Sequence, residues 1–189
     1  MTALSFIGPS PRGASSAGLK NGGLSKGPFP LSGALTERTD YDGIFNVVRS
    51  AVRHAIGRER PGLGLGLADL PPNLGAYWQL TGNMIVINEG IVRVMQAMAK
   101  SVLEYNSFLY VILAHEYLHS LGFLDEEQNR QQTAWVTRQA FGPDHMATKM
   151  AEGDLWQMYP FLRFAPAGDG QRLRVVTKFD TATTSAYIQ

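Results

Sequence analysis

The stretch VILAHEYLHSLGFLDEE, from Val111 to Glu127, places two histidines and several carboxylates in an apolar part of the 189-residue chain. Residues four apart on an α-helix project from the same face, so His115 and His119 would stand side by side. Two imidazoles at this spacing can bind one Zn2+, and Glu116 can accept a proton from the water that the metal activates. We therefore predict a Zn2+ site with Glu116 as the general base.

A catalytic zinc site needs a third protein ligand, which we expect shortly after Gly122. A glycine there lets the chain leave the helix through a left-handed turn and fold back. Asp125 is the first choice, and its alternative role is that of a helix N-cap. Glu126 ranks second. His145 ranks third, because about 16 residues of intervening helix would carry it about 24 Å away.

Residues 115–125 read H-E-x-x-H-x-x-G-x-x-D. This pattern resembles the extended signature of the metzincin metallopeptidases, in the snapalysin-like variant with Asp as third ligand. The chain departs from that family because a helix is expected directly after Asp125 and no clear Met-turn follows. Its layout is also similar to minimal zincins such as the minigluzincins, whose third ligand is a Glu on the following helix. Glu126 or Glu127 would take that place.

The resemblance implies a zinc-dependent endopeptidase of the zincin type. His115, His119 and Asp125 would bind the metal, and Glu116 would act as general base and then as proton donor. The strand of residues 84–88 is the candidate edge strand that aligns an extended peptide substrate by backbone pairing. Tyr77, Tyr159 and His145 are the candidates for stabilising the oxyanion.

Hydrophobic periodicity predicts an α+β fold: a small zincin-like domain with a backing helix, a short mixed sheet with a hairpin, an active-site helix and a following helix, between extended N- and C-terminal tails. The backing helix is expected over 37–58, with Asp40 or Asp42 as N-cap and Gly57 at its end. The other elements expected are a strand within 62–72, a hairpin of 74–80 and 83–88, and helices over 89–100, from Asn106 or Ser107 to Gly122, from Asp125 to Phe141, and within 144–158.

The chain divides by composition into three parts. Residues 1–36 are rich in Gly, Pro and Ser and are expected to form a flexible arm. Residues 37–159 would form the metallopeptidase domain, and residues 160–189 a C-terminal extension with an edge strand within 172–179. The arm has two alternative roles: it orders on a partner, or it lies in the cleft and keeps the enzyme latent.

The overall composition restricts the partners. The chain has no cysteine and a formal net charge of +1, which excludes disulfides and a cysteine nucleophile and gives no global field for nucleic acid or membrane. No signal peptide or membrane span is evident, so a cytoplasmic or particle-associated location is expected.

The expected partner is a peptide or protein substrate, and the tails are candidates for contacts in a homo-oligomer or larger assembly. The alternative function is that of a structural or accessory component of such an assembly, a virion or a multiprotein particle, with the zinc site latent or vestigial.

Overall fold

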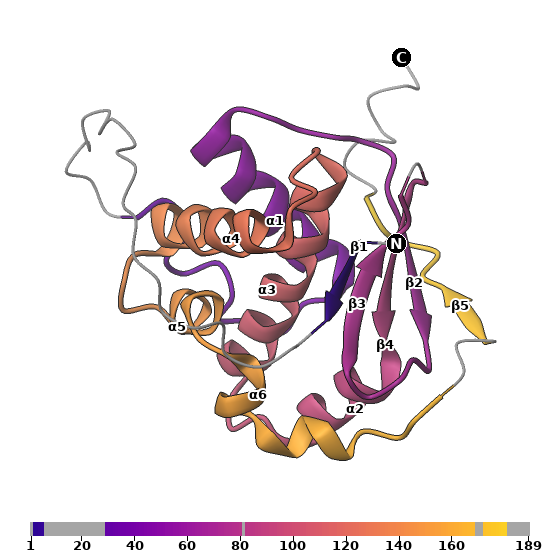
Figure 1. The fold of residues 1–189 in the computed structure, drawn as a ribbon. Helices are drawn as coiled ribbons and strands as arrows, with labels where there is room; N and C mark the ends of the chain where they lie inside the picture. The colour runs from indigo at the N-terminus through magenta and orange to yellow at the C-terminus, as the bar shows by residue number, and fades with distance from the viewer. Residues whose placement is uncertain (1, 6–28, 81, 169–171, 181–189) are drawn as a thin grey trace.

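The computed structural model describes residues 2–5, 29–80, 82–168 and 172–180, which form a mixed α+β fold (Figure 1). The helices α1, α3, α4 and α5 lie on one side of the sheet. This confirms the predicted α+β class. The strands are β1 (Thr2–Ser5), β2 (Gly64–Ala68), β3 (Leu74–Trp78), β4 (Met84–Asn88) and β5 (Leu173–Val175). The helices are α1 (Tyr41–Ile56), α2 (Glu89–Met98), α3 (Val102–Ser120), α4 (Glu126–Phe141), α5 (Met146–Glu152), α6 (Leu155–Met158) and the 3-10 helix η1 (Pro160–Phe164).

The five-stranded sheet has the order β1-β3-β4-β2-β5. β2 and β4 are parallel, and every other neighbouring pair is antiparallel. The predicted hairpin of β3 and β4 is therefore confirmed. The prediction that residues 84–88 form an edge strand is wrong, because β4 lies between β3 and β2. Its continuous apolar run is typical of a strand buried on both faces.

Side-chain caps explain where the helices begin. Asp40 caps α1 by accepting a hydrogen bond from the Gly43 N–H, as predicted. The helix α3 begins at Val102, earlier than the predicted start at Asn106 or Ser107. The Ser101 hydroxyl accepts from the Glu104 N–H, in an S-x-x-E pattern that is the sequence signal of a helix start.

The helix α3 forms the centre of the core. Its residues from Asn106 to Ser120 are all buried, and α1, α4, α5 and the sheet pack around it. A helix that is buried on all sides needs an almost wholly apolar sequence. The histidines of the HEYLH segment therefore stand out in α3, because burial of an imidazole requires a polar partner.

Segments outside the expected domain boundaries also belong to this core. Leu35 is fully buried, and the Asn106 amide donates to the Leu35 and Glu37 carbonyls. After the boundary at 159, Leu162 is buried in the same core. The rest of the expected flexible arm, residue 1 and residues 6–28, lies outside the described residues.

The C-terminal extension is held by β5 and by one carboxylate. β5 pairs with β2, in agreement with the predicted strand within 172–179. The Asp180 carboxylate accepts hydrogen bonds from the N–H groups of Gly62 and Leu63 and pairs with Arg49. Among the described residues, no helix has the length and apolar character that crossing a bilayer requires.

Asn88 joins three elements, so its loss should destabilise the fold. Its amide donates to three carbonyls, those of Leu70, Pro71 and Leu74, while its carbonyl oxygen caps α2. We expect Asn88→Ala to lower the free energy of unfolding by about 2–4 kcal/mol, measured by urea denaturation. The exposed Asn73, changed to Ala, is the matched control and should have little effect. An equal loss in both variants would contradict this role.

Candidate metal centre

The two histidines of HEYLH lie side by side near the C-terminal end of α3. Their ring centroids are 4.6 Å apart. Both rings are buried, with His115 2% and His119 0% exposed. The four-residue spacing thus places two imidazoles next to each other in the core, as the sequence predicts.

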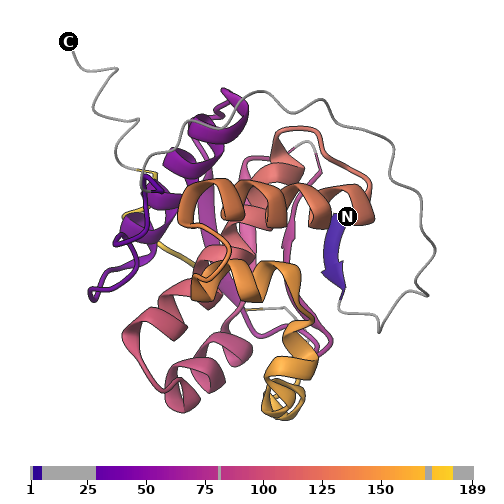
Figure 2. The ribbon, with the colours of Figure 1, turned by 90° about the vertical axis from the view of Figure 1, so that its left-hand side faces the viewer.

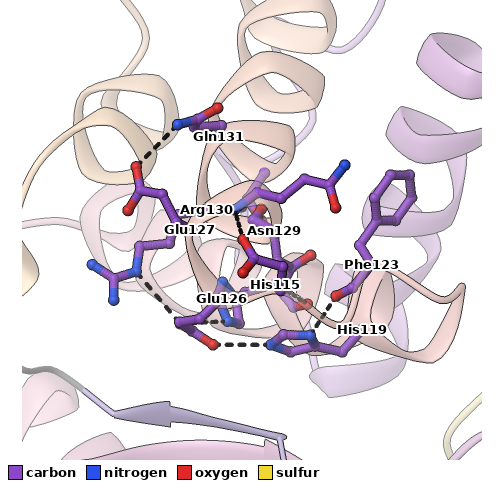
Figure 3. Close-up of polar contacts among 11 residues, drawn as sticks. His115, His119, Phe123, Glu126, Glu127, Asn129, Arg130 and Gln131 are labelled. Atoms are coloured by element: carbon purple, nitrogen blue, oxygen red, sulfur yellow. Dashed lines mark hydrogen bonds and ion pairs between the residues drawn. The ribbon is translucent and has the colours of Figure 1, made fainter. Parts of the chain in front are cut away.

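Glu126, in the first turn of α4, faces both rings (Figure 3). Its two carboxylate oxygens lie 3.2 Å from His115 Nε2 and 3.3 Å from His119 Nε2. The three side chains together can offer ligand atoms that all lie within 4.8 Å of one another. Glu126 is the more accessible member, with its side chain 30% exposed.

These spacings match those of ligands around one zinc ion. Two ligands at about 2.0–2.1 Å from zinc, separated by a tetrahedral angle of about 109°, are about 3.3–3.4 Å apart. The His115–Glu126 and His119–Glu126 separations of 3.2 and 3.3 Å are close to that value. The distances from Glu126 to the two histidines are therefore compatible with ligands of one ion.

The proton on His119 is fixed by its other ring nitrogen. His119 Nδ1 lies 2.7 Å from the Phe123 carbonyl oxygen, which can only accept a hydrogen bond, so Nδ1 carries the proton. In the neutral ring, Nε2 then presents a lone pair to a carboxylate oxygen of Glu126 at 3.3 Å. Two acceptors at this distance repel unless a second proton or a cation lies between them. A carbonyl that holds Nδ1–H is also the usual support of a zinc-bound histidine.

The pKa shifts of Glu126 and of His115 favour a carboxylate at the first residue and a neutral imidazole at the second. Burial raises the pKa of the Glu126 carboxyl, but the hydrogen bonds and charges of His115 and His119 outweigh burial and hold that pKa well below its usual value. Burial lowers the pKa of the His115 imidazole. A carboxylate and neutral imidazoles are the protonation states that zinc requires.

The turn after α3 sets the position of Glu126. Gly122 has a φ of 100°, which a residue with a side chain rarely adopts. The chain then turns back so that α4 packs against α3, and the Asn129 amide donates to the His115 carbonyl at 2.9 Å. Asn129 is fully buried and thereby holds the first turn of α4 against the α3 backbone.

Asp125, the first choice for the third ligand, is not part of this cluster. Its Oδ1 accepts a hydrogen bond from the Gln128 N–H at 2.8 Å, so it is the N-cap of α4 and is exposed. An N-cap carboxylate points back at its own helix, whereas the next residue starts the helical turn that faces α3. Glu127 is also exposed and accepts from Gln131. The structure thus brings Glu126, the second choice, to the histidines in place of Asp125.

His145, the third choice, lies at the far end of α4. Its ring stacks on Phe141, and its Nδ1 accepts from the Ala147 N–H as the N-cap of α5. The 16 residues of α4 span about 24 Å, so His145 is remote from Glu126. It therefore serves neither as a ligand nor as an oxyanion donor in this arrangement.

The two tyrosines named as oxyanion candidates are also elsewhere. Tyr159 donates a hydrogen bond to Glu104 near the start of α3. Glu104 and His115 are separated by about eleven residues of helix, or about 16 Å. Tyr77 packs with a small cluster that includes Val86, while the alternating β3 residues Ala76 and Trp78 belong to the core around α3. Tyr77 therefore lies on the other face of the sheet.

Glu116 follows His115 on α3 and is fully buried. A carboxylate in such surroundings is costly without polar or cationic neighbours. Its place between the two histidines in the sequence is the one that a general base would take. The residues not foreseen from the sequence are Phe123 and Asn129, since a backbone carbonyl and a helix-docking amide leave no sequence signal.

Comparison with known proteins gives no relative: no protein-family model, curated protein or solved structure matches the chain.

Metal binding should depend on Glu126 and not on its acidic neighbours. We expect the wild-type protein to bind zinc and Glu126→Ala to lose at least about 100-fold in affinity, because one of three protein ligands is removed. The matched controls are Asp125→Asn, which keeps a good N-cap, and Glu127→Ala. Both should keep wild-type affinity, measured by competition with a fluorescent zinc chelator. Loss of zinc in Asp125→Asn but not in Glu126→Ala would restore Asp125 as the third ligand.

Proposed function

We propose that this chain is a zinc-dependent endopeptidase of the zincin type, with His115, His119 and Glu126 as its metal ligands. The observation that carries the proposal is the His119–Glu126 contact. A ring whose proton is committed to the Phe123 carbonyl faces one carboxylate oxygen at 3.3 Å, and the other carboxylate oxygen lies 3.2 Å from His115 Nε2. A divalent cation bound among these groups would satisfy all three side chains at once.

The donor set, together with the HEYLH spacing, favours zinc over magnesium and calcium. Two imidazoles and one carboxylate form a recurring ligand set of catalytic zinc, in which a fourth position remains for water. Magnesium and calcium prefer oxygen ligands, so they would bind the two imidazole nitrogens only weakly. When bound, zinc would lower the pKa of water and polarise a substrate carbonyl.

Glu116 is assigned the proton transfers of hydrolysis. Its carboxylate takes a proton from the attacking water while the water oxygen forms a bond to the carbonyl carbon of the peptide. Glu116 then gives that proton to the amide nitrogen as the carbon–nitrogen bond breaks, so that a carboxylic acid, which keeps the other proton of the water, and an amine are released. His115, His119 and Glu126 hold the metal throughout and transfer no proton in this scheme.

The arrangement of the helices supports a minimal zincin over the snapalysin-like variant. The third ligand candidate is a Glu in the first turn of the helix after HEYLH, and Asp125 acts as a cap. The alternative role, as a component of a larger assembly, has no comparable support in the described part of the chain. Its tails remain candidates for contacts with other proteins.

Glu116→Gln should separate catalysis from metal binding. We expect this variant to bind zinc as the wild type does but to cleave peptides about 10²–10⁴-fold more slowly, because the general base is lost. The measurement is cleavage of a mixture of quenched fluorescent peptides, with zinc content determined in parallel. Glu127→Gln is the matched control and should keep full activity.

A chelator should abolish wild-type cleavage, and added zinc should restore it. Wild-type cleavage rates in Glu116→Gln would contradict the assigned mechanism. A protein that binds no zinc when it is offered would contradict the function as a whole.

A further inference from the structure

The candidate site is covered by the protein itself. His115, Glu116 and His119 are at most 2% exposed. The helix α4 covers the histidines from one side through Glu126. On the sheet side, α3 contacts both β3 and its neighbour β1. In the view of Figure 3, β1 is seen below the cluster, and Figure 2 shows β1 at the edge of the sheet.

β1 occupies the edge of β3 that would otherwise be free for another strand. Thr2, Ala3 and Leu4 pair with Trp78, Tyr77 and Ala76 in antiparallel register. The opposite edge of β3 pairs with β4. Without β1, the backbone N–H and C=O groups of β3 that point away from β4 would be available to an extended peptide. That peptide would run antiparallel to β3, beside the helix that carries HEYLH.

The pairing of β1 has features of a displaceable strand. It is only four residues long and lies at the sheet edge. Its register shifts between Leu4 and Ser5, so that Ser5 pairs with Leu74 and Gly75 is skipped. Such a bulge interrupts the ladder of hydrogen bonds. A longer peptide with continuous pairing would make more of these bonds than β1 does.

We propose that β1 is an autoinhibitory strand: residues 2–5 lie in the position of an extended peptide substrate on β3 and must leave before a peptide reaches His115, Glu116 and His119. This inference rests on the proposed function and adds its regulation. The segment that occupies the β3 edge is thus part of the same chain. The strand β3 also replaces β4, the edge strand expected from the sequence, as the strand that aligns the peptide.

The test weakens β1 without altering the metal centre. In Ala3→Pro/Leu4→Pro, two consecutive N–H groups are removed, and because successive N–H groups of a strand point to opposite sides, one of the two faces β3. The matched control is Ser15→Pro/Ser16→Pro, which carries the same change outside the strand. A deletion of residues 1–5 is the second variant, since it introduces no proline. All are compared as zinc-loaded proteins.

The expected result has three parts. The Ala3→Pro/Leu4→Pro variant and the deletion variant should keep zinc and cleave quenched peptides about tenfold faster than the wild type, because one or two strand-pairing hydrogen bonds no longer oppose binding. The serine-to-proline control should behave as the wild type does. The peptide MTALSF, which copies residues 1–6, should inhibit the deletion variant when it is added in trans.

Hydrogen exchange distinguishes failure of this inference from failure of the proposed function. The amides of residues 74–78 should exchange faster in the deletion variant and become protected again when MTALSF is added, whether or not any peptide is cleaved. Equal or slower cleavage with zinc retained would overturn autoinhibition and make β1 part of the substrate platform. If no form of the protein cleaves peptides, renewed protection still supports β1 as a displaceable occupant, and its absence overturns this inference too.

Discussion

The docking of α4 onto the end of α3 is the contact on which the site depends. The turn at Gly122 lets the chain reverse, and Asn129 then ties α4 to the His115 carbonyl. This brings Glu126 within 3.2–3.3 Å of both imidazoles. The same turn delivers the Phe123 carbonyl that holds the proton of His119. One short reversal of the chain thus supplies Glu126, the third ligand candidate, and the carbonyl that supports His119.

Burial of α3 determines how costly these polar groups are. From Asn106 onward the whole helix is enclosed by other helices and the sheet. In such surroundings two imidazoles and two carboxylates destabilise the fold unless they compensate one another. A cation shared by His115, His119 and Glu126 would provide that compensation. On the proposed function, metal binding would therefore also stabilise the folded state, because the unfolded chain holds no such arrangement.

The sheet connects the metal centre to the N-terminal segment. The edge strand β1 covers one side of β3, and β1 also contacts α3. The strand order therefore couples any opening of the β3 edge to the N-terminal residues. The central position of β4 follows from its apolar sequence, which suits burial on both faces.

Local patterns in the sequence were sufficient to predict most of the elements and two of the ligand candidates. The HEYLH spacing, the caps at Asp40 and Asp125, and the hairpin around Gly82 depend on near neighbours along the chain, and the structure has all of them. The helix α3 begins after Ser101 and not at Asn106 or Ser107, because the Ser101 hydroxyl caps it.

Contacts between distant segments required the folded structure. Asp125 and Glu126 are adjacent in sequence, and the direction in which each points depends on how α4 packs against α3: one carboxylate caps its own helix and the other faces the histidines. The pairing of β1 with β3 joins residues 69 to 76 positions apart. Helical spacing follows from backbone geometry alone, whereas the third ligand and the covered sheet edge follow from packing, which no short stretch of sequence encodes.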